Sequence, residues 1–225
     1  MSNISDNLKC VRQRIEEACE RAGRSSDEIT LLAVTKTVST EKMAELESLG
    51  VSSFGENRVQ ELLNKYDAFD NISWHLIGHL QTNKVKSIVG KVDLIHSVES
   101  VRLAREIGKH SVNAGLVTDI LIEVNVSGEE SKYGISIDKI DEMLDECSRI
   151  EGIFVKGLMT MAPLGAETEE IREIFSSLYK KYVDISSKKY DNISMEYLSM
   201  GMSNDYEIAI EEGANIVRVG RGLFQ

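Results

Sequence analysis

"TLLAVTK", residues 30–36, is a run of apolar and β-branched side chains that ends in a lysine. Runs of this kind, bounded by polar segments, are typical of strands that are buried on both faces of a parallel sheet. Seven similar runs follow along the chain, at residues 51–55, 73–78, 92–98, 119–126, 154–159, 195–200 and 215–220. The sequence therefore predicts eight strands.

Charged, periodic segments of helical character separate these runs, among them "STEKMAELESLG" (39–50) and "SIDKIDEMLDECSRI" (136–150). Strands joined by helices pair in parallel through right-handed crossovers, and eight of them predict an α/β fold of the closed (β/α)8 TIM-barrel type. A doubly wound open sheet is the alternative. It usually has fewer strands, and no G-x-G-x-x-G follows the first strand here.

The two ends of the chain complete this prediction. The sequence stops just after the eighth strand, where a barrel needs one more outer helix. An amphipathic N-terminal helix, with Val11, Ile15 and Ala18 on one face, is expected to take that place. Because no linker or composition break divides the chain, residues 1–225 are expected to form a single domain.

Composition narrows the classes of partner. Lys and Arg number 26 against 37 Asp and Glu, a net charge of 26 − 37 = −11, which argues against a general affinity for nucleic acid or anionic membranes. The polar N-terminus and the absence of a long apolar run predict a cytoplasmic protein. Three cysteines without a C-x-x-C pair, and histidines without ligand spacing, predict no metal site.

Candidate functional residues were sought at the strand ends, because a barrel of this type builds its active site from the C-terminal ends of its strands. Lys36 ends the first strand, and Asn57 follows the second. His75 lies on the third strand, Met159 ends the sixth, and Arg218 lies within the eighth.

Two glycine-containing loops predict a phosphate site. "LSMGMSND" (198–205) follows the seventh strand with Ser199 and Ser203 around Gly201, and "RVGRG" (218–222) follows the eighth. Barrels commonly hold phosphates at these two loops, where backbone N–H groups can approach an anion closely. Ser203 or Asn204 is also expected to cap the next helix. The alternative is that the glycines only make tight turns.

A strand-end lysine that faces a phosphate site is the arrangement expected for pyridoxal 5′-phosphate. The amine forms a Schiff base with the cofactor's aldehyde, and the phosphate anchors the far side of the ring. Lys36 must spend time deprotonated for this, which an apolar strand mouth and a neighbouring cation would both favour. The alternative is that Lys36 has simply reached solvent.

Arg218 would add a third contact. If it points into the barrel, it can donate to the pyridine nitrogen, and a permanently protonated guanidinium would keep that nitrogen unprotonated. The cofactor would then be a weaker electron sink. The alternative is an outward-facing arginine that pairs with a helix carboxylate.

The segments "AVTKT", "FGENRVQE", "WHLIGHLQTNK", "GLMTMAP", "LSMGMSNDYEIAI" and "VRVGRGLF" resemble the pyridoxal phosphate homeostasis protein family, from about Leu31 to the C-terminus. The resemblance implies a barrel similar to the N-terminal domain of alanine racemase and a role for each matching residue. It implies Lys36 as the Schiff-base lysine, Asn57 beside the cofactor, Ser199, Met200 and Gly201 along the phosphate and ring, Arg218 at the pyridine nitrogen, and Gly220 at the phosphate. The family pattern has a small hydroxylic residue where this chain has Arg221. Any side-chain contact with the phosphate at this position would therefore come from the charge of the arginine instead of from a hydroxyl group.

The resemblance implies a carrier or regulator of pyridoxal phosphate, a vitamin B6 form, with apo-enzymes as candidate clients and a monomer or weak dimer as the assembly. Racemisation would need an acid/base group on each face of the cofactor, and in alanine racemase the second is a tyrosine associated with an additional domain. A robust enzyme is therefore not expected. The alternatives are a pyridoxal phosphate-dependent racemase or lyase and, disfavoured by charge, an RNA-associated barrel.

Overall fold

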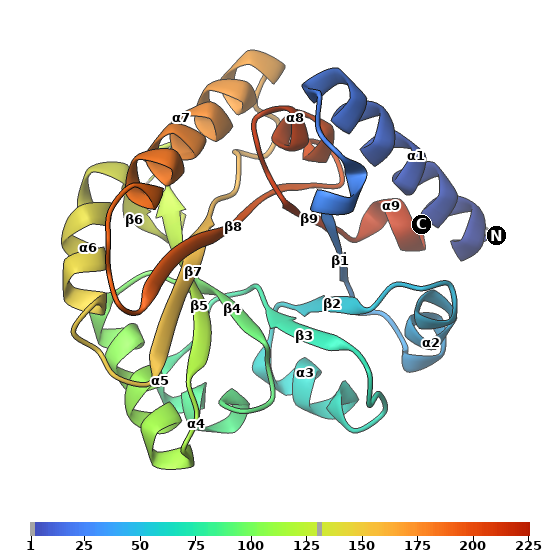
Figure 1. Cartoon of the computed structure of the whole chain (residues 1–225). Coiled ribbons are helices and arrows are strands. Elements are labelled where there is room, and N and C mark those ends of the chain that lie inside the picture. The colour runs from blue at the N-terminus through green and yellow to red at the C-terminus, as the bar shows by residue number, and fades with distance from the viewer. Residues whose placement is uncertain (1–2, 130–131) are drawn as a thin grey trace.

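A closed parallel β-barrel surrounded by helices forms the molecule (Figure 1). The computed structural model describes residues 3–129 and 132–225. Eight strands follow one another around the ring in the order β4-β3-β2-β1-β9-β8-β7-β5, and pairing of β4 with β5 closes it. The strands are β1 (Thr30–Val34), β2 (Ser53–Glu56), β3 (Ser73–Leu76), β4 (Leu94–Val98), β5 (Thr118–Asn125), β7 (Ile153–Met159), β8 (Ile193–Met202) and β9 (Ile216–Val219).

All eight predicted strands, and the barrel class with them, are confirmed. One strand was missed: β6 (Ile135–Ser136) adds to the edge of β5 at its C-terminal end, where Val124 pairs with Ile135. Two residues are too few to leave a pattern of alternating or continuous apolar side chains.

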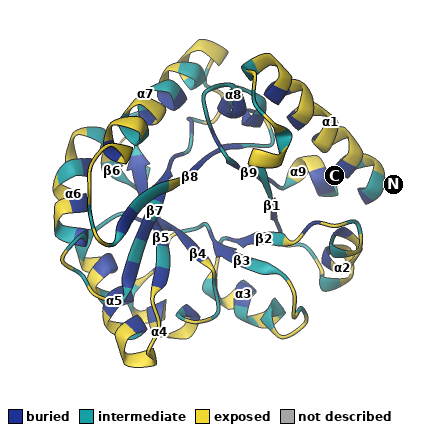
Figure 2. Cartoon of the chain, in the orientation of Figure 1, coloured by how far each residue is buried: buried dark blue, intermediate teal, exposed yellow. Residues whose placement is uncertain are grey.

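Helices cover the outside of the barrel with their buried faces inward and their exposed faces to solvent (Figure 2). They are α1 (Ile4–Ala22), α2 (Thr40–Ser48), α3 (Val59–Tyr66), α4 (Val85–Ile88), α5 (Val101–Ala114), α6 (Ile140–Cys147), α7 (Thr168–Ser186), α8 (Tyr206–Glu211) and α9 (Arg221–Phe224). Short 3-10 turns lie at Ser26–Glu28, Thr82–Lys84 and Ile137–Lys139. In this described part of the chain, no helix has both the length and the hydropathy that crossing a bilayer requires.

The N-terminal helix takes the place that was predicted for it. Helix α9, after the last strand, has only four residues, and α1 packs over it between α8 and α2 (Figure 1). Asn7 donates from Nδ2 to the carbonyl of Leu223, and Arg21 pairs with Glu211 on α8. These contacts join the first and last segments of the chain.

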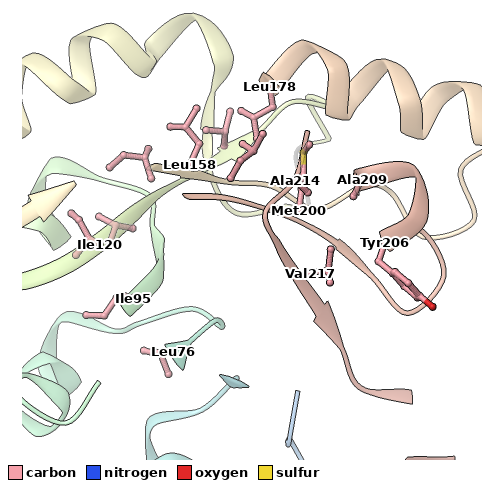
Figure 3. Packing of buried hydrophobic residues seen from close by; sticks show 14 of the residues in the cluster. Leu76, Ile95, Ile120, Leu158, Leu178, Met200, Tyr206, Ala209, Ala214 and Val217 are labelled. Carbon is pink, nitrogen blue, oxygen red and sulfur yellow. The ribbon is translucent and has the colours of Figure 1, made fainter. Parts of the chain in front are cut away.

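The apolar core has two parts, because successive side chains of a strand point to opposite faces. The larger part fills the layer between barrel and helices, and Figure 3 shows members such as Ile95, Ile120 and Val217. The smaller part lies inside the barrel and consists of Leu32, Leu94, Leu121, Met159 and Ile216. Polar residues occupy other buried positions of the strands, and they lead to the functional site.

Candidate functional site

A cavity of about 440 Å³ opens at the C-terminal ends of the strands. Five of the residues predicted from strand-end position line it together: Lys36, Asn57, Arg218, Gly220 and Arg221. A neighbouring hollow of about 520 Å³ shares Lys36, Gly220 and Arg221 with the cavity. The amine of Lys36 is thus placed beside two open spaces.

The backbone before Lys36 is held by a buried ion pair. Lys65 on α3 donates from Nζ to the carboxylate of Glu56, at 2.7 Å, and to the carbonyl of Thr35, at 2.8 Å. The hydroxyl of Thr35 donates to the same carboxylate oxygen at 2.7 Å. Because Glu56 is fully buried at the end of β2, this clamp ties the end of β1 to the end of β2.

Lys36 itself is exposed, so the expectation that an apolar strand mouth would desolvate it is wrong for this structure. Strand β1 ends at Val34, and the chain then turns at Thr37, which has a φ of 62°. The turn carries the side chain out of the apolar layer. Its neighbouring cations on the cavity wall are Arg218 and Arg221.

Asn57 lies directly after β2, where the chain leaves the barrel wall. Gly78, after β3, packs against its backbone so closely that an added Cβ would lie 2.3 Å from the carbonyl oxygen of Asn57. Any side chain at Gly78 would therefore displace Asn57.

Arg218 points into the barrel, as one of the two predicted interpretations required. The residue is 3% exposed, and it donates to the hydroxyl of Ser199 at 2.6 Å and to the carbonyl of Thr160 at 2.8 Å. Burial lowers the pKa of its guanidinium to about 10, against the opposing effect of the carboxylates of Asp205 and Glu123. The group is therefore still a cation at neutral pH.

The loops after β8 and β9 meet beside Arg221. Ser203 accepts hydrogen bonds at its hydroxyl oxygen from the backbone N–H groups of Gly220, at 3.3 Å, and Gly222, at 3.4 Å. The predicted capping by Ser203 or Asn204 is wrong, since α8 begins after Asp205, whose carboxylate accepts from the backbone N–H of Met202 instead. The hydroxyl of Ser203 and the two N–H groups form one small polar cluster at the cavity rim.

Five of the predicted residues do not line the cavity with their side chains: His75, Met159, Ser199, Met200 and Gly201. His75 and Ser199 are buried in a polar network behind Arg218, and Met159 belongs to the apolar cluster inside the barrel. Met200 packs outward beside Ala214, towards the helices (Figure 3). Direct contact of these five with a cofactor stays a prediction.

Met200 follows the inward-facing Ser199 and so points outward by ordinary strand alternation, whereas a bulge accounts for the position of Gly201. Ser199 pairs with Ile216, but Met202 pairs with Arg218, so β8 carries one extra residue between these pairs. Gly201 has a φ of 91° and faces α8, where an added Cβ would lie 2.5 Å from that of Ala209. The glycine is required there by helix packing.

Sequence reasoning missed part of the cavity wall. The loop after β7, residues 161–166, lines the cavity with Met161, Pro163 and Leu164, and Leu164 is 91% exposed. The apolar stretch "MAPLGA" in an expected loop was the available signal.

Glu123 on β5 was also missed. It is 3% exposed, and burial, with the nearby charge of Glu99, raises its pKa to about 7. An acidic residue inside the apolar run "DILIEVNV" was the signal for it.

Comparison with known proteins agrees with this architecture. The family model of the alanine racemase N-terminal domain matches residues 4–225. The chain is 45% identical over 224 residues to the pyridoxal phosphate homeostasis protein of Aquifex aeolicus (99% of this chain, 97% of the relative). It is 35% identical to the Escherichia coli K12 protein of the same name (100% of this chain, 97% of the relative).

Among solved structures, PipY of Synechococcus elongatus PCC7942 with PLP bound superposes with a TM-score of 0.86 at 29% identity, covering 99% of this chain and all of PipY. An alanine racemase of Clostridium difficile 630 shares the fold, with a TM-score of 0.76 at 16% identity over 99% of this chain and 56% of the racemase. The chain therefore belongs to the pyridoxal phosphate homeostasis protein family, within the broader family of the alanine racemase N-terminal domain.

The clamp behind Lys36 yields a prediction for stability. Lys65→Met leaves the carboxylate of Glu56 buried without its cation, which is expected to lower the free energy of unfolding by about 3–5 kcal/mol. Adding Glu56→Gln removes the unpaired charge, so the double variant is expected to be more stable than Lys65→Met alone. Urea unfolding of Lys65→Met, Glu56→Gln and the double variant measures these losses, with the exposed Lys86→Met as control. A double variant that loses the sum of the two single losses would show that the pair does not interact.

Proposed function

We propose that this protein binds pyridoxal 5′-phosphate in the cavity at the strand ends and acts in cofactor homeostasis, as a carrier or regulator rather than as a robust enzyme. The observation that carries the proposal is that Lys36 and the buried cation of Arg218 line one cavity. The names of the relatives and the PLP bound to PipY support the same conclusion.

The residues present fit this cofactor in charge and position. The amine of Lys36 suits the aldehyde, the guanidinium of Arg218 suits the pyridine nitrogen, and the cluster at Ser203, Gly220 and Arg221 suits the phosphate. A cavity of about 440 Å³ is within the range that small-molecule sites occupy, roughly 300–1,000 Å³.

The cofactor supplies an aldehyde that reacts reversibly with amines. Nζ of Lys36 would be the amine that holds this aldehyde covalently. Because Lys36 is exposed, water can reach Nζ, which would favour release of the cofactor. Ready reversal is what a carrier requires.

Arg218 gives an electronic reason for weak catalysis. A guanidinium that donates to the pyridine nitrogen leaves this nitrogen unprotonated, so that the ring withdraws electrons less strongly. Although burial lowers the pKa of Arg218 to about 10, its guanidinium is still a cation at neutral pH. Robust turnover of any amino acid by the purified protein would overturn this part of the proposal.

Lys36 is expected to be the covalent attachment point. Borohydride reduction of the protein loaded with pyridoxal 5′-phosphate should fix the cofactor on Lys36, as peptide mass spectrometry can show, and Lys36→Ala should abolish the near-visible absorbance band of the loaded protein. Lys42→Ala is the matched control, because Lys42 lines the neighbouring hollow with Lys36. Reduction onto another lysine in the unaltered protein would contradict the assignment.

The phosphate contact is expected to depend on charge. Pyridoxal, which lacks the phosphate, should bind at least about tenfold more weakly than pyridoxal 5′-phosphate, because a charge-assisted hydrogen bond contributes roughly 1.5–3 kcal/mol. Arg221→Met should reduce this preference, whereas the exposed Arg102→Met should not. Fluorescence titration of the unaltered protein and the two variants with each compound, six titrations in all, measures the ratios. Equal affinity for the two compounds would remove the phosphate site from the proposal.

A further inference from the structure

A continuous series of five hydrogen bonds crosses the barrel interior behind the cavity. It begins at Arg218 on β9, passes through Ser199 on β8, His96 on β4, and His75 and Ser73 on β3, and ends at Asp93. Its lengths from Arg218 to Asp93 are 2.6, 3.0, 2.9, 3.1 and 3.0 Å. Strands β4 and β8 are not neighbours in the sheet, so the bond between His96 and Ser199 spans the inside of the barrel.

The Asp93 end determines which atoms donate. A carboxylate only accepts, so the hydroxyl of Ser73 donates to Asp93 and its oxygen accepts from Nε2 of His75. A neutral His75 with its proton on Nε2 offers Nδ1 as an acceptor. His96 must then donate to it from Nε2.

The contacts at the Arg218 end independently require the same assignment of donors and acceptors. A guanidinium only donates, so the oxygen of Ser199 accepts from Arg218. The hydroxyl proton of this fully buried serine then has Nδ1 of His96 as its acceptor, at 3.0 Å. A neutral His96 with its proton on Nε2 satisfies both ends at once.

Both imidazoles lie in surroundings that keep them neutral. Burial lowers the pKa of His75 to about 4, against a raising effect from Asp93. Burial also lowers the pKa of His96 well below its ordinary value, and the nearby His75 and Arg218 add to this effect. Protonation of His75 would in addition force His96 to accept at Nε2 and donate at Nδ1, which leaves the hydroxyl of Ser199 without an acceptor.

We propose that His75 and His96 are positioning residues for Arg218: with Ser73 and Ser199 they form a one-way hydrogen-bond chain that runs from the buried guanidinium to the carboxylate of Asp93. The direct acceptors of Arg218 are Ser199 and Thr160, which are both neutral. The chain orients each dipole with its positive end towards Asp93, so the negative ends face the guanidinium.

The consequence for the cavity is a fixed donor. Arg218 is held by Ser199 on one Nη atom and by Thr160 on the other, and the orientation of Ser199 is set by His96. The hydrogen-bond chain stands without any cofactor. Its effect on cofactor binding rests on the proposed function, and the two are tested by separate measurements.

The first experiment measures the tautomers in the cofactor-free protein. Two-dimensional NMR of ¹⁵N-histidine-labelled protein distinguishes protonated from unprotonated ring nitrogens, and the sequence has only four histidines to assign, with His79→Gln and His110→Gln as aids. We expect Nε2 protonated and Nδ1 unprotonated in both His75 and His96 at neutral pH. A proton on Nδ1 of either ring would overturn the one-way chain.

The second experiment separates positioning from mere packing. In His96→Gln the side-chain amide can accept from Ser199 and donate to His75, as the imidazole does, whereas His96→Leu can do neither. We expect separate Nη resonances for Arg218 in the unaltered protein and in His96→Gln, and merged ones in His96→Leu. Identical Arg218 spectra in His96→Leu and the unaltered protein would overturn the positioning role.

Cofactor affinity provides a further comparison on the same variants. His96→Leu should weaken pyridoxal 5′-phosphate binding on the order of two- to tenfold, while His96→Gln and the control His110→Leu, on α5 outside the barrel, should stay within about twofold. Equal loss in His96→Leu and His96→Gln would contradict positioning through the chain. If neither the unaltered protein nor any variant binds the cofactor, the proposed function is rejected. The hydrogen-bond chain would then be tested by the NMR results alone.

Discussion

The buried guanidinium of Arg218 is the constraint on which the rest of the site depends. A permanent cation inside a barrel wall is costly unless its donors find acceptors, and its neighbours are arranged accordingly. Ser199 and Thr160 accept from it directly, and the carboxylates of Asp205 and Glu123 act on it from further away. The barrel interior is therefore part apolar cluster and part polar network.

The surroundings of Lys36 contrast with those of Arg218, whose side chain is buried. The backbone of Lys36 is anchored by the buried pair of Glu56 and Lys65, while its side chain is exposed at the cavity. If Lys36 holds the cofactor covalently, as proposed, its accessible amine favours a bond that forms and reverses easily. This exposure and the buried cation of Arg218 are the two features that support the proposed role in storage and release.

Much of this could be predicted from the sequence, because the barrel strands are long apolar runs and strand ends converge at one face. Lys36, Asn57, Arg218, Gly220 and Arg221 were found in this way, and they do line one cavity. The rest depended on details that local patterns do not carry. The bulge in β8 turns Gly201 towards α8, and the turn at Thr37 exposes Lys36. The hydrogen bond between His96 and Ser199 joins β4 and β8, two strands that are neither consecutive in the sequence nor adjacent in the sheet.

The most direct test of the account is a crystal structure of the protein with pyridoxal 5′-phosphate. The account predicts electron density continuous from Nζ of Lys36 to the cofactor, the guanidinium of Arg218 within hydrogen-bond distance of the pyridine nitrogen, and the phosphate beside Ser203, Gly220 and Arg221. Cofactor bound at another cavity, or in this one with Arg218 turned away from the ring nitrogen, would contradict it.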